Sequence, residues 1–331
     1  MISSTENSMD KKSPGEALGA KRRMPHQFKL LCAFMGMCVI FSVANPQFIT
    51  LSNLLNVFRQ ASTLFMLACG QTLVLLVAGI DLSQGSVVGL VSVMTALGLI
   101  KFGLVPGVLL GLLTGTVSGF IIGLVITKAK VVPFVVTLGM LFIAEGATLF
   151  ITDGQPVFGI PHAVSKQFFF IGGGYLGPVP FPIILFALAL LTFFFILKWT
   201  RLGRYLYAIG GNEDAAHLSG INLDNVKILV YTLNGALVAL GSIILTSRVN
   251  SGQPLLGGDY LMESIGAVVI GGTSLFGGRG GVLQTCLGVC FIAFMVNGLN
   301  ILGVSSFVKQ MLIGILMIGA VFLTFQSGRG R

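Results

Sequence analysis

The chain has 331 residues, of which 54% are hydrophobic and only 9% are charged. Soluble domains carry about a quarter charged residues, so this composition excludes an ordinary soluble protein and predicts an all-α membrane protein. The formal net charge of +9 is compatible with nucleic-acid binding. However, the basic residues flank apolar runs, which favours a role in membrane topology and no nucleic-acid partner.

The chain begins with a polar, basic stretch, residues 1–27, which we expect to be a cytoplasmic tail. The apolar run that follows is too long for the core of a signal peptide, and no small-residue cleavage site is evident, so it should remain as a membrane anchor. Residues 28–325 are predicted to form one transmembrane domain, and residues 326–331 a second cytoplasmic tail.

Apolar runs of about 18 residues or more predict roughly ten transmembrane helices. They lie at 28–48, 61–80, 84–101, 105–127, 132–152, 182–199, 226–246, 262–276, 281–300 and 305–325. The run at 262–276 is short and rich in glycine, which is typical of a broken or re-entrant helix.

The distribution of basic residues predicts the orientation. With both termini in the cytoplasm, 15 of the 20 Lys and Arg residues lie on the cytoplasmic side. This bias follows the positive-inside rule, and it places the loop after residue 199 inside and the loop at 153–181 outside.

The segment GIDLSQGS (Gly79–Ser86) interrupts two apolar runs. Asp81 or Ser83 can cap the helix that follows, so the segment is interpreted first as a capped turn between two helices. A compatible interpretation is a polar break beside a solute path, as in transporters with discontinuous helices.

Polar side chains also occur inside the apolar runs, and two roles are open for them. Hydrogen bonding between helices is the commoner role for each one alone, while together they can line a path for a hydroxyl-rich solute. Glu263 and Lys309 lie near the outer ends of their spans and can reach water there. The candidate path or gate residues are Asp81, Ser83, Gln253, Glu263 and Asn297.

The glycine-rich stretch around Gly277–Gly281 also allows two interpretations. The favoured one is a flexible inner loop in which Arg279 sets topology. The alternative is a gate, or a second contact with a cytoplasmic partner.

A short helix is predicted in the polar loop between the spans that end at 199 and begin at 226. Asn212 can cap it, two carboxylates suit its first turn, an alanine pair follows, and Gly220 can end it. A helix this short is not stable alone, so we expect it to dock into a partner. The residues assigned to docking are Asn212, Glu213, Ala215, Ala216 and Gly220.

Catalytic chemistry is not expected, and neither is a bound cofactor or metal. The loops are too short for a catalytic domain, and no phosphate-binding G-x-x-x-x-G-K-[ST] motif is present. The five cysteines lie in apolar segments without metal-ligand spacing. If the protein moves a solute uphill, the energy should come from another subunit.

Four ordered motifs resemble the ribose-type sugar permeases of bacterial ABC importers. They are GIDLSQGS, KAKVVPFVVTLGML (Lys128–Leu141), the loop RLGRYLYAIGGNEDAAHLSGINLDNVK, and AVVIGGTSLFGGRGG (Ala267–Gly281), followed by NGLNILGVSS (Asn297–Ser306). The resemblance covers about residues 50–325. It implies a multi-pass inner-membrane subunit that works as a pair, with cytoplasmic ABC ATPases and a periplasmic sugar-binding protein.

Three positions depart from that family's pattern. The coupling motif has a Glu-Ala-Ala core with a Gly four positions later, whereas Asp214 here separates Glu213 from its alanine pair. Relatives tend to carry a Glu directly after Tyr260 and an Asp where Glu263 stands. They also tend to have paired Asn residues where Val296 precedes Asn297 here.

The sequence thus predicts a permease subunit that imports a monosaccharide, such as a ribose-like pentose, a hexose or a polyol, while partner subunits bind and hydrolyse ATP. The resemblance implies a second permease copy, in a homodimer, surrounded by membrane lipid. An ion-coupled secondary transporter is the alternative, with Asp81 as its buried carboxylate. A structural membrane scaffold without transport is a third possibility. The docking helix is the discriminating feature, because an ion-coupled transporter has no use for it.

Overall fold

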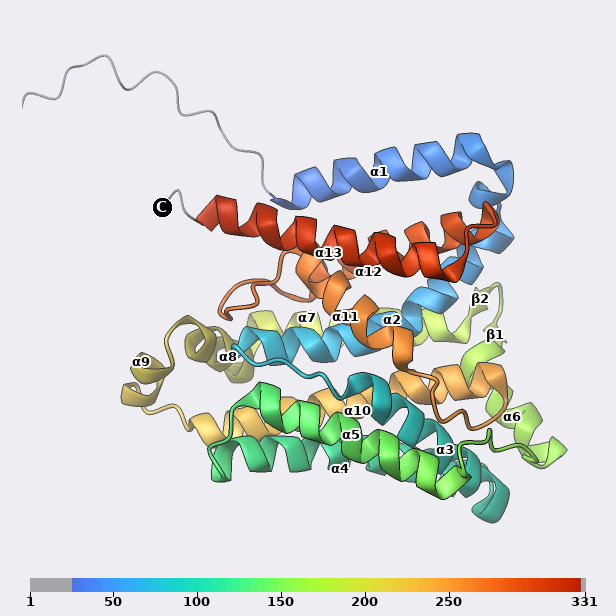
Figure 1. The fold of residues 1–331 in the computed structure, drawn as a ribbon, viewed down its shortest axis with the longest axis horizontal. Coiled ribbons are helices and arrows are strands. Elements are labelled where there is room, and N and C mark those ends of the chain that lie inside the picture. The colour runs from blue at the N-terminus through green and yellow to red at the C-terminus, as the bar shows by residue number, and fades with distance from the viewer. Residues whose placement is uncertain (1–25, 329–331) are drawn as a thin grey trace, which may run out of the picture.

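The computed structural model describes residues 26–328 (Figure 1). The predicted tails, 1–27 and 326–331, lie mostly outside this range. The helices are α1 (His26–Ala44), the 3-10 helix η1 (Pro46–Ile49), α2 (Leu51–Leu76), α3 (Gln84–Phe102), α4 (Leu104–Lys128), α5 (Pro133–Thr152), α6 (His162–Gly173), α7 (Phe181–Trp199), α8 (Arg201–Gly211), α9 (Glu213–Leu218), α10 (Leu223–Val249), α11 (Gly258–Gly271), α12 (Val282–Ile301) and α13 (Ser306–Gly328). A small antiparallel hairpin, β1 (Tyr175–Leu176) and β2 (Val179–Pro180), precedes α7.

Each of the ten predicted spans coincides with a helix, and the all-α polytopic architecture is confirmed. Within the described residues, seven helices are long and apolar enough to cross a membrane, namely α1, α3, α4, α5, α7, α10 and α12. Helix α11 has only 14 residues, which at 1.5 Å per residue is about 21 Å and short of a hydrocarbon core of about 30 Å. The count of ten spans stays a prediction.

Helices α2 and α10 form the centre of the bundle. Every residue of α2 from Ala61 to Leu76 is buried, so other helices shield this half of α2 from lipid. Helix α10 packs along α4, where a Cβ atom at Gly119 would lie 2.1 Å from the Tyr231 carbonyl oxygen. This contact requires glycine, because only small residues let two membrane helices approach so closely.

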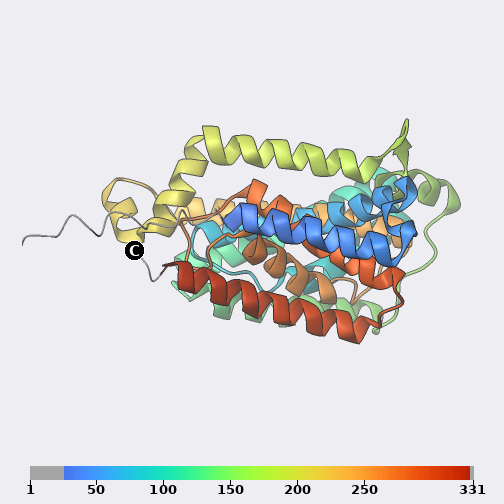
Figure 2. The same cartoon turned by 90° about the horizontal axis from the view of Figure 1, so that it is seen from above.

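The described ends of the chain lie at the same end of the bundle as α8 and α9, whereas α6 and the β1–β2 hairpin lie at the opposite end (Figures 1 and 2). We call these the α9 end and the α6 end. The arrangement agrees with the prediction that both termini share a side with the docking loop. Which side faces the cytoplasm remains a prediction from the basic residues.

The segment between α2 and α3 differs from the expected capped turn. Helix α2 ends at Leu76, the chain turns at 77–79, where Ala78 has φ +58°, and it then runs back into the bundle before α3 begins (Figure 1). We call residues 77–83 the extended segment. Ser83 occupies the N-cap position of α3, but its side chain makes no capping hydrogen bond. Asp81, the other predicted cap, does accept from the backbone N–H of Ser83 at 2.8 Å. The predicted cap is thus partly present, but the two helices are joined by a break inside the bundle and not by a tight turn.

Candidate functional site

The predicted docking helix is present as α9. The Asn212 side-chain oxygen accepts a hydrogen bond from the backbone N–H of Ala215 at 2.9 Å, as expected of an N-cap. At the other end, Gly220 N–H donates to the His217 carbonyl and Ile221 N–H to the Ala216 carbonyl, while Gly220 has φ +82°. These bonds form a Schellman motif, which requires a left-handed residue at the glycine position.

Helix α9 stands clear of the bundle, with Ala216 as its one buried residue. Leu218 is 87% exposed, and it is the one large apolar side chain that α9 presents to a docking partner. Leu218 was not among the residues predicted for docking. The available signal was a single large apolar residue in an otherwise small and polar helix.

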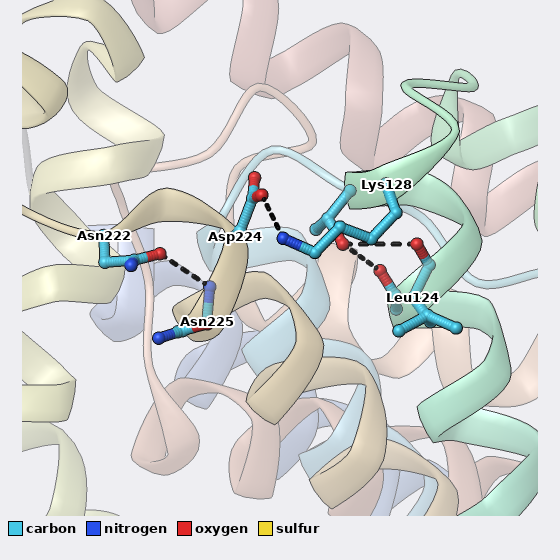
Figure 3. A network of polar contacts seen from close by, with 7 residues as sticks. Leu124, Lys128, Asn222, Asp224 and Asn225 are labelled. Atoms are coloured by element: carbon cyan, nitrogen blue, oxygen red, sulfur yellow. Dashed lines mark hydrogen bonds and ion pairs between the residues drawn. The ribbon is translucent and has the colours of Figure 1, made fainter.

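Two ion pairs tie this region to the bundle. Lys227 Nζ of α10 lies 2.6 Å from Glu213 Oε1 of α9. Lys128 Nζ, at the end of α4, lies 2.9 Å from Asp224 Oδ2, while Asn222 caps α10 by accepting from Asn225 N–H (Figure 3). The first pair joins α9 to α10 and the second joins α4 to α10, and pairs near the surface contribute at most about 1 kcal/mol each.

Helix α8 meets two other segments at its last turn. A Cβ atom at Gly210 would lie 1.9 Å from the Leu76 carbonyl oxygen and 2.4 Å from the Gly278 nitrogen. Gly278 N–H also donates to that Leu76 carbonyl at 3.1 Å. We call this contact of α2, α8 and the 272–281 loop the glycine junction.

The junction also has a side-chain contact. Tyr207 of α8 donates its hydroxyl to the Gly280 carbonyl at 2.8 Å, and burial raises the pKa of this phenol, which keeps it a neutral donor. The glycine-rich loop is therefore packed against α8, which corrects the favoured interpretation of a flexible loop.

Asp81 lies at the centre of a buried polar network. Its Oδ1 accepts from the backbone N–H and the hydroxyl of Ser83, at 2.8 and 2.6 Å, and its Oδ2 accepts from Asn234 Nδ2 at 2.5 Å. Gln84 Nε2 donates to Asn234 Oδ1 at 2.7 Å, and Ser264 donates to Gln84 Oε1 at 2.9 Å. The network joins the extended segment, α3, α10 and α11.

The other path candidates do not join this network. Gln253 donates from its side chain to Ser251 and from its backbone to Ser92. Asn297 of α12 exchanges two amide hydrogen bonds with Asn53 of α2, at 2.9 and 3.0 Å. Glu263 faces a separate cavity between α11 and α13. The structure therefore distributes the candidate path residues over four places, and their assignment to a path or gate stays a prediction.

A cofactor or metal site would need clustered ligands. Among the described residues, no three His, Cys, Asp or Glu side chains lie close enough together to hold a metal ion. The described features are suited to transmitting movement. They are an exposed capped helix, a junction that links it to α2, and a polar break inside the bundle.

These features define a class, the membrane-embedded subunit of a transport system. Residues 53–321 match the family described as the permease component of the branched-chain amino acid transport system. The match covers most of the chain, which therefore belongs to this permease family.

Several curated relatives are similar over most of their length. The ribose import permease protein RbsC of Bacillus subtilis (strain 168) is 46% identical over 287 residues, covering 86% of this chain and 88% of the relative. RbsC of Escherichia coli (strain K12) is 38% identical over 297 residues, covering 89% and 92%. The L-arabinose transport system permease protein AraH of Escherichia coli (strain K12) is 35% identical over 300 residues, covering 90% of each chain. No solved structure matches this chain.

Proposed function

We propose that this chain is the transmembrane subunit of an ABC importer in a bacterial inner membrane, and that its solute is a monosaccharide. The observation that carries the proposal is α9, a capped and exposed helix at the predicted cytoplasmic end. The names of the relatives, which include ribose and L-arabinose permeases, support a sugar as the solute.

In the proposed mechanism, a periplasmic binding protein delivers the sugar at the α6 end, and two cytoplasmic ATPases bind ATP at the α9 end. Each ATPase receives α9 of one copy in a permease homodimer. When the ATPases close, α9 moves with them and shifts α8, because Asn212 both ends α8 and caps α9. The chain itself holds no ATP in this scheme.

The glycine junction carries this movement into the membrane. Gly210 contacts the end of α2 and Gly278 with no intervening side chain, so α8 cannot shift without displacing them. The extended segment 77–83 follows directly from α2 and leads into the Asp81 network. Movement of packed helices around a polar break is a recognised form of alternating access.

An ion-coupled transporter would use Asp81 as a carboxylate that binds and releases a cation. Both oxygens of Asp81 already accept hydrogen bonds from Ser83 and Asn234, and the side chain is buried at 3% exposure. This arrangement favours a structural carboxylate, so the ATPase-driven importer remains the proposal.

The decisive experiment reconstitutes the full chain in proteoliposomes with an ABC ATPase and a sugar-binding protein from the same organism. We expect uptake of labelled D-ribose or another monosaccharide that requires both ATP and the binding protein. Uptake by the chain alone, driven by a proton or sodium gradient, would contradict the proposal. The control is the same complex with an ATPase variant that binds but does not hydrolyse ATP.

A further inference from the structure

We propose that the cavity between α11 and α13 is a subsite of the transport path that binds a neutral polyhydroxyl solute, an inference that rests on the proposed function. The cavity has a volume of about 430 Å³ and lies between the first turns of α11 and the first three turns of α13. This volume is within the usual range for small-molecule sites, about 300–1,000 Å³.

The polar wall of the cavity combines acceptors and donors. Asp259 and Glu263 are four residues apart on α11 and so lie on one face of that helix. Lys309 and Gln310 face them from α13. Gln310 Nε2 donates to Asp259 Oδ1 at 2.7 Å, and Lys309 Nζ donates to the side chain of Asn300.

Glu263 differs from its neighbours because it is partly buried and yet has no hydrogen bond or ion pair to any of the described side chains, 27–319. Its carboxylate is open to the cavity, which Lys309 also lines, and it can accept hydrogen bonds from donors there. Hydroxyl groups of a solute in the cavity would supply those donors, while Lys309 and Gln310 can donate to the hydroxyl oxygens.

The lining of the cavity is also partly apolar and includes Met262, Ile313 and Met317. A monosaccharide presents both kinds of surface, since its ring has a C–H face and its edge carries hydroxyl groups. Two carboxylates against one ammonium disfavour an anionic solute. The cavity therefore suits a neutral sugar better than a sugar acid.

Helix α11 also connects this cavity to the buried network. Glu263 lines the cavity, and the next residue, Ser264, donates to Gln84, which bonds Asn234 and through it Asp81. Since α11 is only 14 residues long and is flanked on both sides by non-helical segments, a shift of α11 changes the cavity and the network together.

The test measures weak binding directly, apart from transport. The full chain is placed in lipid nanodiscs, and binding of D-ribose is followed by saturation-transfer difference NMR, with empty nanodiscs as the blank. We expect a signal from ribose that falls at least five-fold in Glu263→Gln and in Gln310→Leu. Asp153→Asn is the matched control, because Asp153 is an exposed carboxylate outside the cavity, at the end of α5.

The arms of the experiment separate the possible failures. D-Gluconate should give no signal; a signal from gluconate equal to that from ribose would overturn the assignment. A signal seen only with the amino sugar D-glucosamine would also overturn the assignment. The same holds if both cavity variants keep the full ribose signal. If the reconstituted complex imports ribose while the nanodisc sample binds none, the subsite is wrong and the importer stands. If the complex imports no monosaccharide and the nanodisc sample binds no ribose, both proposals fail. Gln310 is exposed, so its variant tests the cavity even if Glu263→Gln does not fold.

Discussion

The side-chain amide of Asn234 donates to the carboxylate of Asp81 at 2.5 Å, and both side chains are buried. The bond joins the middle of α10 to the extended segment that interrupts α2 and α3. Asn234 uses its other side-chain atom, Oδ1, to accept from Gln84, so each polar atom of its amide has a defined partner. A buried network that is fully bonded in this way specifies one arrangement of its segments.

This arrangement predicts the effect of Asp81→Asn. The new amide nitrogen would face the Asn234 nitrogen, so two donors would oppose each other, and a buried unpaired polar group costs about 1–3 kcal/mol. We expect a lower yield of assembled protein and earlier thermal unfolding, with an unchanged order of preference among sugars. Yield and monodispersity in detergent and competition between sugars in uptake assays measure these effects.

The double variant Asp81→Asn, Asn234→Asp provides the control. It exchanges the two groups, so Asn at position 81 can donate to Asp at position 234, which can still accept from Gln84. We expect it to recover most of the lost stability. An Asp81→Asn protein that assembles normally but prefers a different sugar would show that Asp81 contacts the solute instead.

Gly220 gives a second prediction, through its backbone conformation. A Cβ atom there would meet nothing within 4 Å, but the φ of +82° strains any β-branched residue by roughly 1–2 kcal/mol. Gly220→Val should therefore disrupt the end of α9, with sugar uptake falling more than ten-fold while the protein still inserts and the ATPases still hydrolyse ATP. Proteoliposome uptake and ATPase rates from the same sample measure this uncoupling.

Gly220→Asn is the matched variant, because asparagine adopts the left-handed conformation more readily than other non-glycine residues. It should retain most of the uptake. Wild-type uptake by Gly220→Val would mean that the end of α9 does not transmit the movement.

The glycine junction yields a third prediction from two neighbouring glycines. Gly210→Ala places a methyl group 1.9 Å from the Leu76 carbonyl oxygen, whereas a Cβ at Gly211 meets nothing within 4 Å. Overpacking typically costs about 1–3 kcal/mol, so Gly210→Ala should lower the unfolding temperature and Gly211→Ala should not. A thiol-reactive dye reports the unfolding through Cys69, which is buried in α2, in a background where the other four cysteines are replaced by serine. Equal unfolding temperatures for the two variants would contradict the packing at the junction.

The apolar runs were sufficient to predict the membrane helices. Helical residues that are polar because they bond to other parts of the bundle were not recognised as helical. Helix α2 begins at Leu51, ten residues before the predicted start, because Thr50 caps it and polar residues such as Asn53 bond to other parts of the bundle. Helices α6 and α8 were missed because they have only 12 and 11 residues, fewer than a membrane span needs, and contain the basic residues Lys166, Arg201 and Arg204.

The docking helix could be predicted because its signals are local, namely a cap, a charged first turn and a terminal glycine. The Asp81 network could not, because its partners are far apart in sequence: Asn234 lies 153 residues from Asp81, and Ser264 lies 180 residues from Gln84. Spacing along one chain does not show which turn of α10 or α11 faces a break after α2. The exposure of Leu218 likewise depends on how far α9 projects from the bundle.

Leu218 carries the last prediction, on the docking of the ATPase. Its side chain is 87% exposed, so Leu218→Ser should leave the fold of the chain intact. If a partner covers this leucine, its burial is worth about 1.5–3 kcal/mol, and the variant should bind the ATPase roughly 10- to 100-fold more weakly.

Leu218→Met, which keeps the apolar volume, should bind normally. Leu255→Ser removes another exposed leucine, which is 66% exposed and lies after α10 at the α6 end, and should have no effect on the ATPase. Titration of the purified ATPase onto nanodisc-bound permease measures all three affinities. Equal weakening by Leu218→Ser and Leu255→Ser would place the docking surface elsewhere than on α9.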